Sequence, residues 1–182
     1  MKPLAAAAPV EFASERLLVR SISEGDLELY CQLFCDPETM RHIGPPWTRT
    51  AAVRAFRGVL EATRSTPPRA LFLTLTTKDA QQPLGLCTLQ NLDPAKRQTE
   101  LGVMLVSAGR EQGLATEALI AVIAHAFATL PVDEVWVRFA IDHLACERLA
   151  VSVGLVRYAA ASPEDLAANL WRWSACRGAW QL

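Results

Sequence analysis

The segment Arg110–Ala115 combines residue types that can bind a phosphate group without a metal ion. It follows a strand-like apolar run, Leu101–Val106, and it opens a segment with helical character. A helix that begins after such a turn presents free backbone N–H groups and the positive end of its dipole in one direction. Gly113 and Ala115 leave the backbone uncovered, so a pyrophosphate can approach closely. Arg110 can add a charge-assisted contact, although a plain turn before a helix would have the same residue types.

The composition is that of one folded domain. The chain has 182 residues, of which 51% are hydrophobic, and this argues against disorder. A net charge of -1 gives no reason to expect nucleic acid or an anionic membrane as a partner. No apolar run approaches transmembrane length, and residues 1–12 are expected to form a loose tail before a domain at 13–182. The five cysteines lack metal-site spacing, so we expect free thiols in a reducing cytoplasm.

Hydrophobic periodicity predicts the elements that position this loop. Apolar or alternating runs predict strands at 16–20, 71–76, 84–89, 99–106, 135–140 and 170–176. Helical spacing predicts helices at about 26–35, 50–64, 113–128 and 143–153, the last of them ended by Gly154. The predicted order, β-α-α-β-β-β-α-β-α-β-β, is that of a mixed α/β sheet, and it includes one strand at the C-terminal end beyond the six ranges above.

Three separated segments resemble the GNAT family of N-acetyltransferases. Arg110–Ala115 has the Arg/Gln-x-x-Gly-x-Gly/Ala spacing of the family's coenzyme A pyrophosphate loop, and Ala115–Leu119 resembles the subgroup that includes ribosomal-protein N-terminal acetyltransferases. Glu15–Arg20 resembles the family's "E-R-L-x-L-R" strand, and Asp36–Gly44 resembles its "D-P-E-V-M-R-Y-I-G" segment. The resemblance covers nearly the whole chain. It implies a single-domain α/β fold with a mixed, mostly antiparallel sheet that splays at the coenzyme A site and is flanked by helices.

The resemblance also implies a coenzyme site. The strand before the loop would hold the pantetheine arm through its backbone, with an N–H near Met104 or Leu105 as the oxyanion donor. His143 stands where the family usually has Asn, and it could still hydrogen-bond to the coenzyme. The implied coenzyme-binding residues are Met104, Leu105, Val106, Arg110, Glu111, Gln112, Gly113, Leu114, Ala115, Thr116 and His143.

Glu100 and Cys146 are the candidates for proton transfer that the resemblance implies. Glu100 would act as general base, directly or through water, and the alternative is a solvated residue at the start of a strand. Cys146 stands where the family has Ser, and a thiol of pKa ~8.5 could protonate a leaving thiolate of similar basicity. The alternative for Cys146 is packing within its helix. A nucleophilic pair of Cys146 with His143 is disfavoured, because residues three apart on one helix have poor geometry for proton transfer.

These expectations define an acetyl-CoA-dependent N-acetyltransferase that transfers acetyl directly to a primary amine, on a protein N-terminus or a small molecule. Candidate acceptor-pocket residues are Tyr30, Phe34, Trp47 and Trp171, although for each of them taken singly a place in the core is the favoured alternative. Metal, nucleic acid and membrane partners are not expected, and a homodimer is left open. Two alternatives also stay open: an acyltransferase with a longer acyl-CoA or carrier-protein donor, and a degenerate coenzyme A-binding sensor.

Overall fold

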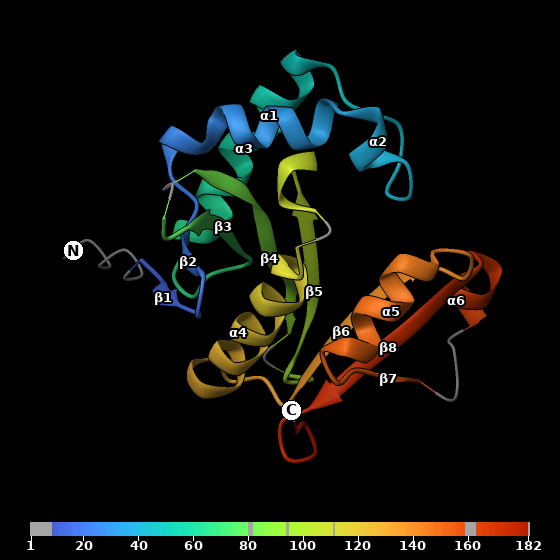
Figure 1. Ribbon diagram of the computed structural model, residues 1–182. Coiled ribbons are helices and arrows are strands. Elements are labelled where there is room, and N and C mark those ends of the chain that lie inside the picture. The colour runs from blue at the N-terminus through green and yellow to red at the C-terminus, as the bar shows by residue number, and fades with distance from the viewer. Residues whose placement is uncertain (1–8, 80–81, 94, 111, 159–162, 182) are drawn as a thin grey trace.

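The computed structural model describes residues 9–79, 82–93, 95–110, 112–158 and 163–181. Within that part, eight strands form one sheet in the spatial order β1-β2-β3-β4-β5-β6-β8-β7 (Figure 1). Neighbouring strands are antiparallel except β5 and β6, which are parallel. The strands are β1 (Glu11–Ala13), β2 (Leu17–Ser21), β3 (Leu71–Thr77), β4 (Pro83–Asp93), β5 (Gln98–Leu105), β6 (Glu134–Ala140), β7 (Val156–Arg157) and β8 (Leu170–Cys176).

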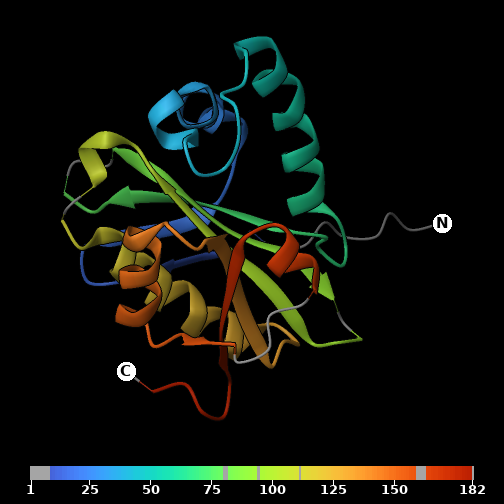
Figure 2. The ribbon, with the colours of Figure 1, turned by 90° about the vertical axis from the view of Figure 1, so that its right-hand side faces the viewer.

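Helices cover both faces of this sheet (Figures 1 and 2). Side chains alternate between the two faces along β3 and β4. Leu73 and Cys87 therefore lie in one apolar core, between the sheet and α4. Phe72 and Leu86 lie in a second core on the other face, with α1 and α3. The helices are α1 (Leu27–Cys35), α2 (Pro37–Met40), α3 (Arg49–Arg64), α4 (Leu114–Thr129), α5 (Leu144–Ser152) and α6 (Pro163–Ala167), with 3-10 turns η1 (Glu24–Asp26) and η2 (Ser107–Gly109).

A buried ion pair fixes the chain where β2 leads into α1. Asp26 is 2% exposed, and its two carboxylate oxygens each lie 2.7 Å from an Arg20 guanidinium nitrogen. Ser23 donates to the same carboxylate from its backbone N–H at 2.7 Å and from its hydroxyl at 2.9 Å. Burial alone would raise the pKa of Asp26, but the hydrogen bonds from Arg20 and Ser23 hold it below its ordinary value.

The sheet forks between β5 and β6. The two strands are paired only at Gln98–Glu134, Thr99–Val135 and Glu100–Trp136, while β5 continues to Leu105 and β6 to Ala140. The predicted mixed, mostly antiparallel sheet that splays between these strands is therefore confirmed. Since β4 occupies one edge of β5, the edge toward β6 is left without a ladder partner beyond Glu100.

The structure differs from the sequence expectations at the two ends of the chain. Residues 11 and 12, which were expected in a loose tail, belong to β1, whose register pairs Phe12 with Val19. The boundary of the domain stays a prediction. The predicted order includes a second strand at the C-terminal end but gave no range for β7, and α6 was not predicted, because two and five residues are too few to show periodicity. In the part of the chain that is described, no helix is both long and apolar enough to cross a membrane.

Candidate active site

The predicted phosphate loop ends in an uncapped helix N-terminus. Gly113 precedes α4 with φ +72°, in the left-handed region where other residues are strained, and no side chain caps the helix. The first hydrogen bond of the helix is donated by the Glu117 N–H to the Gly113 carbonyl, at 3.1 Å. The N–H groups of residues 114–116 therefore have no acceptor within the helix. A Cβ at Gly113 would meet only Arg16, at 3.7 Å. Uncapped N–H groups at a helix N-terminus are donors that fit a phosphate group.

Arg16 adds a positive charge beside this loop that the sequence analysis did not identify. Its guanidinium donates to the Gln112 carbonyl at 3.0 Å and to Glu117 at 2.6 Å, and its side chain is 48% exposed. Burial alone would raise the pKa of Glu117, but hydrogen bonds from Ser14 and Arg16 hold it below its ordinary value. Arg16 therefore ties the start of β2 to both the loop and the first turn of α4.

Arg110, the predicted charged contact of the loop, is directed toward α2. It donates to the Thr39 hydroxyl at 2.7 Å, and it lies 3.2 Å from Glu38 and 3.8 Å from Asp36. Its Nε donates to the Leu105 carbonyl at 3.2 Å. A contact between Arg110 and a phosphate would require the guanidinium to leave these carboxylates, and that contact stays a prediction.

The remaining loop residues make local contacts. The Gln112 amide donates to the Ala108 carbonyl at 2.8 Å, and the Thr116 hydroxyl lies 3.2 Å from that of Ser152 on α5. Leu114 is 4% exposed and belongs to the core beneath α4, with Ala115 packed against it. Glu111 lies outside the described residues.

The open edge of β5 presents backbone donors to the fork. The Val106 N–H donates to the Leu84 carbonyl at 2.9 Å, in register with the β4–β5 ladder. Because donors alternate along an antiparallel strand, the Met104 N–H faces β4, whereas those of Val103 and Leu105 face the fork. Of the two predicted oxyanion donors, only Leu105 is free of the ladder.

Glu100 lies at the vertex of the fork. Its register partner is Trp136, in the last pair before the strands separate. One carboxylate oxygen accepts a hydrogen bond from the Asn91 amide at 2.6 Å and lies 3.5 Å from the Arg138 guanidinium. The side chain is 23% exposed, so a small molecule or water can reach it. The contacts from Asn91 and Arg138 hold the carboxylate at this position.

His143 and Cys146 lie at the start of α5 but have different surroundings. The His143 ring stacks on that of His42 with centroids 3.8 Å apart, and burial, His42 and Arg41 together lower its pKa. Cys146 packs against the core, and burial raises the pKa of its thiol to about 11. Such a thiol stays protonated at neutral pH, which argues against a nucleophile, and it is a weaker acid than an ordinary thiol.

The four aromatic residues proposed for the acceptor pocket do not come together. Tyr30, Phe34 and Trp47 stack in series, with centroid distances of 4.3 and 4.8 Å, and Tyr30 is only 2% exposed. Trp171 packs against the α4 core instead, and Arg157 lies 4.7 Å above its ring. Alternation along β8 places Trp171 on this side of the sheet, whereas Tyr30 and Phe34 belong to the core with α1 and α3. The assignment of these residues to an acceptor pocket stays a prediction.

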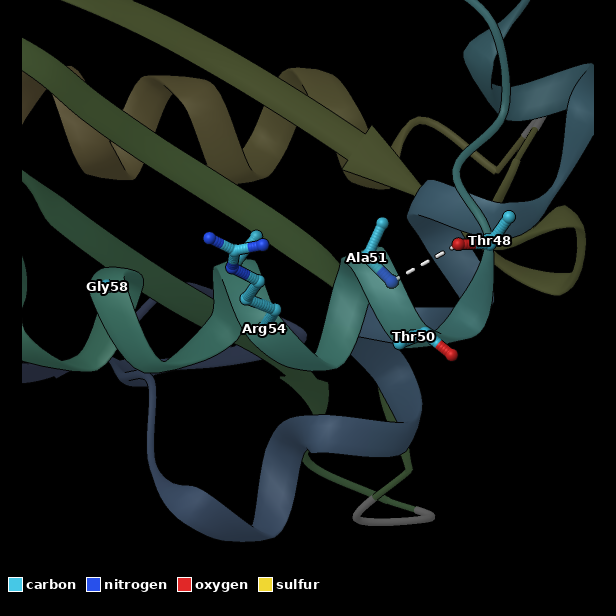
Figure 3. A pocket seen from close by; sticks show the side chains of 6 residues that line it. Thr48, Thr50, Ala51, Arg54 and Gly58 are labelled. Atoms are coloured by element: carbon cyan, nitrogen blue, oxygen red, sulfur yellow. Dashed lines mark hydrogen bonds between the residues drawn. The ribbon is translucent and has the colours of Figure 1, made fainter.

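Two pockets lie elsewhere on the surface. One of about 530 Å³ runs along α3, where the Thr48 hydroxyl accepts from the Ala51 N–H at 3.2 Å (Figure 3). It is lined by Thr48, Thr50, Ala51, Arg54, Ala55 and Gly58. Another of about 240 Å³ lies beside β7 and β8. Neither is lined by Glu100, Gly113 or Cys146, so neither of these two pockets lies at the fork.

The chain belongs to the GNAT family of acetyltransferases, because the family model described as an acetyltransferase (GNAT) domain matches residues 16–156. Acetyl-CoA is the acetyl donor of this family. A search of curated protein sequences finds no match.

Solved structures share the fold. Spermidine N-acetyltransferase from Vibrio cholerae, in complex with CoA and spermine, has a TM-score of 0.77 at 13% identity, covering 90% of this chain and 97% of that one. An acetyltransferase from Agrobacterium tumefaciens has a TM-score of 0.77 at 19% identity, covering 96% and 98%. RimL, a ribosomal L7/L12 alpha-N-protein acetyltransferase, has a TM-score of 0.78 at 12% identity, covering 92% and 94%.

Proposed function

We propose that this protein transfers the acetyl group of acetyl-CoA directly to a primary amine, with no acetyl-enzyme intermediate. The fork between β5 and β6 is the observation on which the proposal rests. It places the Glu100 carboxylate at the vertex of an open strand edge that leads to the uncapped N-terminus of α4. A proton acceptor, backbone donors and a phosphate-binding turn therefore follow one another along a single stretch of chain.

Each part of this stretch has one task. Acetyl-CoA supplies a thioester: the amine nitrogen bonds to the carbonyl carbon and the carbon–sulfur bond breaks. The leaving thiolate takes the second proton that the nitrogen loses, so coenzyme A leaves as its thiol. The Leu105 N–H donates to the carbonyl oxygen, where negative charge develops. Glu100 accepts, directly or through water, the proton that the acceptor ammonium loses. The N–H groups at the start of α4 hold the pyrophosphate.

The acceptor class follows from the chemistry that two fold neighbours share. One is described as a spermidine N-acetyltransferase and the other as an alpha-N-protein acetyltransferase, and both names specify an amine nitrogen. We therefore propose a primary amine, with a small polyamine and a protein N-terminus as the two acceptor types to test. Membership of an acetyltransferase family favours this function over a longer acyl donor or a sensor without turnover.

Thiol release tests the proposal. The protein is incubated with acetyl-CoA and each member of a panel of small amines and short peptides, and free coenzyme A is measured together with the acetylated product. We expect release of coenzyme A that depends on the presence of an amine. If none of the tested amines causes release, the result would favour the sensor. A parallel panel of acyl-CoA chain lengths should show acetyl-CoA as the preferred donor.

The Glu100→Gln variant tests the proton acceptor. We expect turnover to fall by about 10²–10⁴-fold with little change in acetyl-CoA affinity, because a general base acts on the acceptor and not on the coenzyme. The acidic limb of the pH–rate profile should disappear. A wild-type rate across the pH range would show that Glu100 is only a residue at the end of a strand.

We further propose a cytoplasmic location, which the five free cysteines of the described chain support.

A homodimer, which the family resemblance suggests, would be detected by light scattering as twice the mass of one chain.

A further inference from the structure

Two stacked histidine rings join elements that lie on opposite faces of the sheet. His42 lies in the turn after α2, which packs against α1, and His143 precedes α5, which packs with α4 on the other face. The two ring centroids are 3.8 Å apart. Because paired strands separate the two faces elsewhere, elements of opposite faces can meet only at an outer edge of the sheet or where neighbouring strands diverge (Figure 1).

The segment that contains His42 also contacts the end of β5, which places the histidine stack at the fork. Arg110 follows β5 and donates to the Thr39 hydroxyl on α2 at 2.7 Å. Within the segment, the Arg41 guanidinium donates to the His42 ring at 3.3 Å. The segment 39–42 therefore crosses from the end of β5 to the start of α5, over the part of the fork where β5 and β6 are unpaired.

These contacts complete a closed frame around the fork. β5 and β6 form its sides, the pair of Glu100 with Trp136 closes it at the vertex, and the segment 39–42 closes it at the open end. The proposed pyrophosphate site at the start of α4 lies on one face of the sheet, since Leu114 belongs to the core with α4. Glu100 lies on the other face, because residues of the same parity on β5 share a face and Met104 packs in the core with α1 and α3. A coenzyme that reaches both sites must pass through the frame.

We propose that His42 is a positioning residue for the coenzyme, whose stack on His143 keeps the frame closed and holds the pantetheine arm in the fork. This inference rests on the proposed path of acetyl-CoA from the start of α4 to Glu100. An arm enclosed by the frame can leave sideways only when the two rings separate, so the stack slows the release of the coenzyme. His42 is exposed and lies outside both cores, so its replacement leaves the packing of the fold intact.

Acetyl-CoA and ADP are the two probes that test this role. ADP has the pyrophosphate of the coenzyme but no pantetheine arm, so it occupies only the start of α4. In His42→Ala, we expect the dissociation rate of acetyl-CoA, measured by stopped-flow, to rise about 2- to 10-fold, which corresponds to the loss of one aromatic pair. The affinity for ADP, measured by calorimetry, should stay unchanged. His42→Phe keeps an aromatic ring at this position and should restore a dissociation rate close to that of the wild type.

His125→Ala is the matched control. It also removes a stacked histidine, because the centroid of the His125 ring lies 4.3 Å from that of Phe12. This second stack joins α4 to β1, at the outer edge of the sheet, and not to either side of the fork. We expect His125→Ala to bind and release acetyl-CoA as the wild type does.

The outcomes separate this inference from the proposed function. An unchanged dissociation rate in His42→Ala would overturn the role of His42, and so would an equal loss of affinity for acetyl-CoA and ADP, because that would place the effect at the phosphate site. A dissociation rate in His42→Phe as fast as that in His42→Ala would show that the stack is not the cause. These measurements use no amine, so they do not depend on the identity of the acceptor. Failure of the wild type to bind acetyl-CoA would overturn the proposed function itself.

Discussion

Replacement of Gly113 by Asp or Asn tests whether the turn before α4 binds the coenzyme phosphates. The two side chains have the same shape, and both tolerate the left-handed conformation that φ +72° requires better than other residues do. A Cβ at this position meets no atom closer than the Arg16 guanidinium at 3.7 Å, so neither variant is excluded by space. The two proteins therefore differ by one negative charge at the phosphate site.

The size of the effect follows from Coulomb's law. A charge about 5 Å from a phosphate costs about 1–3 kcal/mol at the effective dielectric of a protein surface, which corresponds to about 5- to 150-fold in affinity. Arg16 neutralises part of the new charge, because its guanidinium lies beside the substituted position. We therefore expect Gly113→Asp to bind acetyl-CoA about 10- to 50-fold more weakly than Gly113→Asn.

Isothermal titration calorimetry measures both affinities, and thermal unfolding shows whether both variants are folded. Each should lose about 1 kcal/mol of stability from the backbone conformation. The difference in affinity should narrow as salt is raised, because screening weakens the repulsion between exposed charges. Equal affinities in two folded variants would refute the assignment of the phosphate site to this turn.

Three further predictions concern single residues. Cys146→Ala should keep the rate of acetyl transfer within about twofold and lose about 1–2 kcal/mol of stability from packing. A single-turnover rate reduced tenfold or more would instead support proton donation by the thiol. Asp26→Asn should destabilise the protein by about 2–3 kcal/mol in urea at neutral pH, since Arg20 loses a buried partner. The lowered pKa of Asp26 means that this stabilisation is lost as pH falls through the folded-state value, so the gap between the two proteins should close in acid. The pKa of His143 is lowered, so the unfolded state takes up more protons and the wild type should lose stability below about pH 6.5. His143→Asn should remove part of that loss. Urea unfolding at several pH values measures how the free energy of unfolding changes with pH, and the same dependence in the variant and the wild type would show that the ring contributes nothing.

Local patterns in the sequence predicted most of the elements that surround the site. The apolar run before Arg110 is β5, the apolar segment after Gly113 is α4, and Gly154 ends α5 with φ +75°. These features depend on neighbours a few residues apart, so a single sequence contains them. The resemblance selected Glu100 as a candidate general base, but its position at the vertex of the fork depends on strand register, which periodicity cannot give.

Contacts between distant segments were not predictable in the same way. Arg16 and Gln112 are 96 residues apart, and only the register of β2 against the neighbouring strands brings them together. The direction of Arg110 toward α2 and the side of the sheet that Trp171 occupies depend on packing between elements. Arg138 has a local signal, a charge within the apolar run of β6, but its ion-pair partner Asp165 lies on a five-residue helix that periodicity does not show.

The fork has a consequence for how the whole molecule is held together. Three residue pairs join β5 to β6, so the backbone ladder between the two halves of the sheet is short, and a shared apolar core provides the rest of the contact. A ligand that spans the open edge takes the place of missing backbone hydrogen bonds and braces the two halves. Coenzyme A at about 100 times its dissociation constant would add ~2.7 kcal/mol to the free energy of unfolding. Slower amide hydrogen exchange should then be found in β6 and α5 as well as in the loop before α4. Ligand occupancy, and not only the amino-acid sequence, would thus set the rigidity of the C-terminal half of this fold.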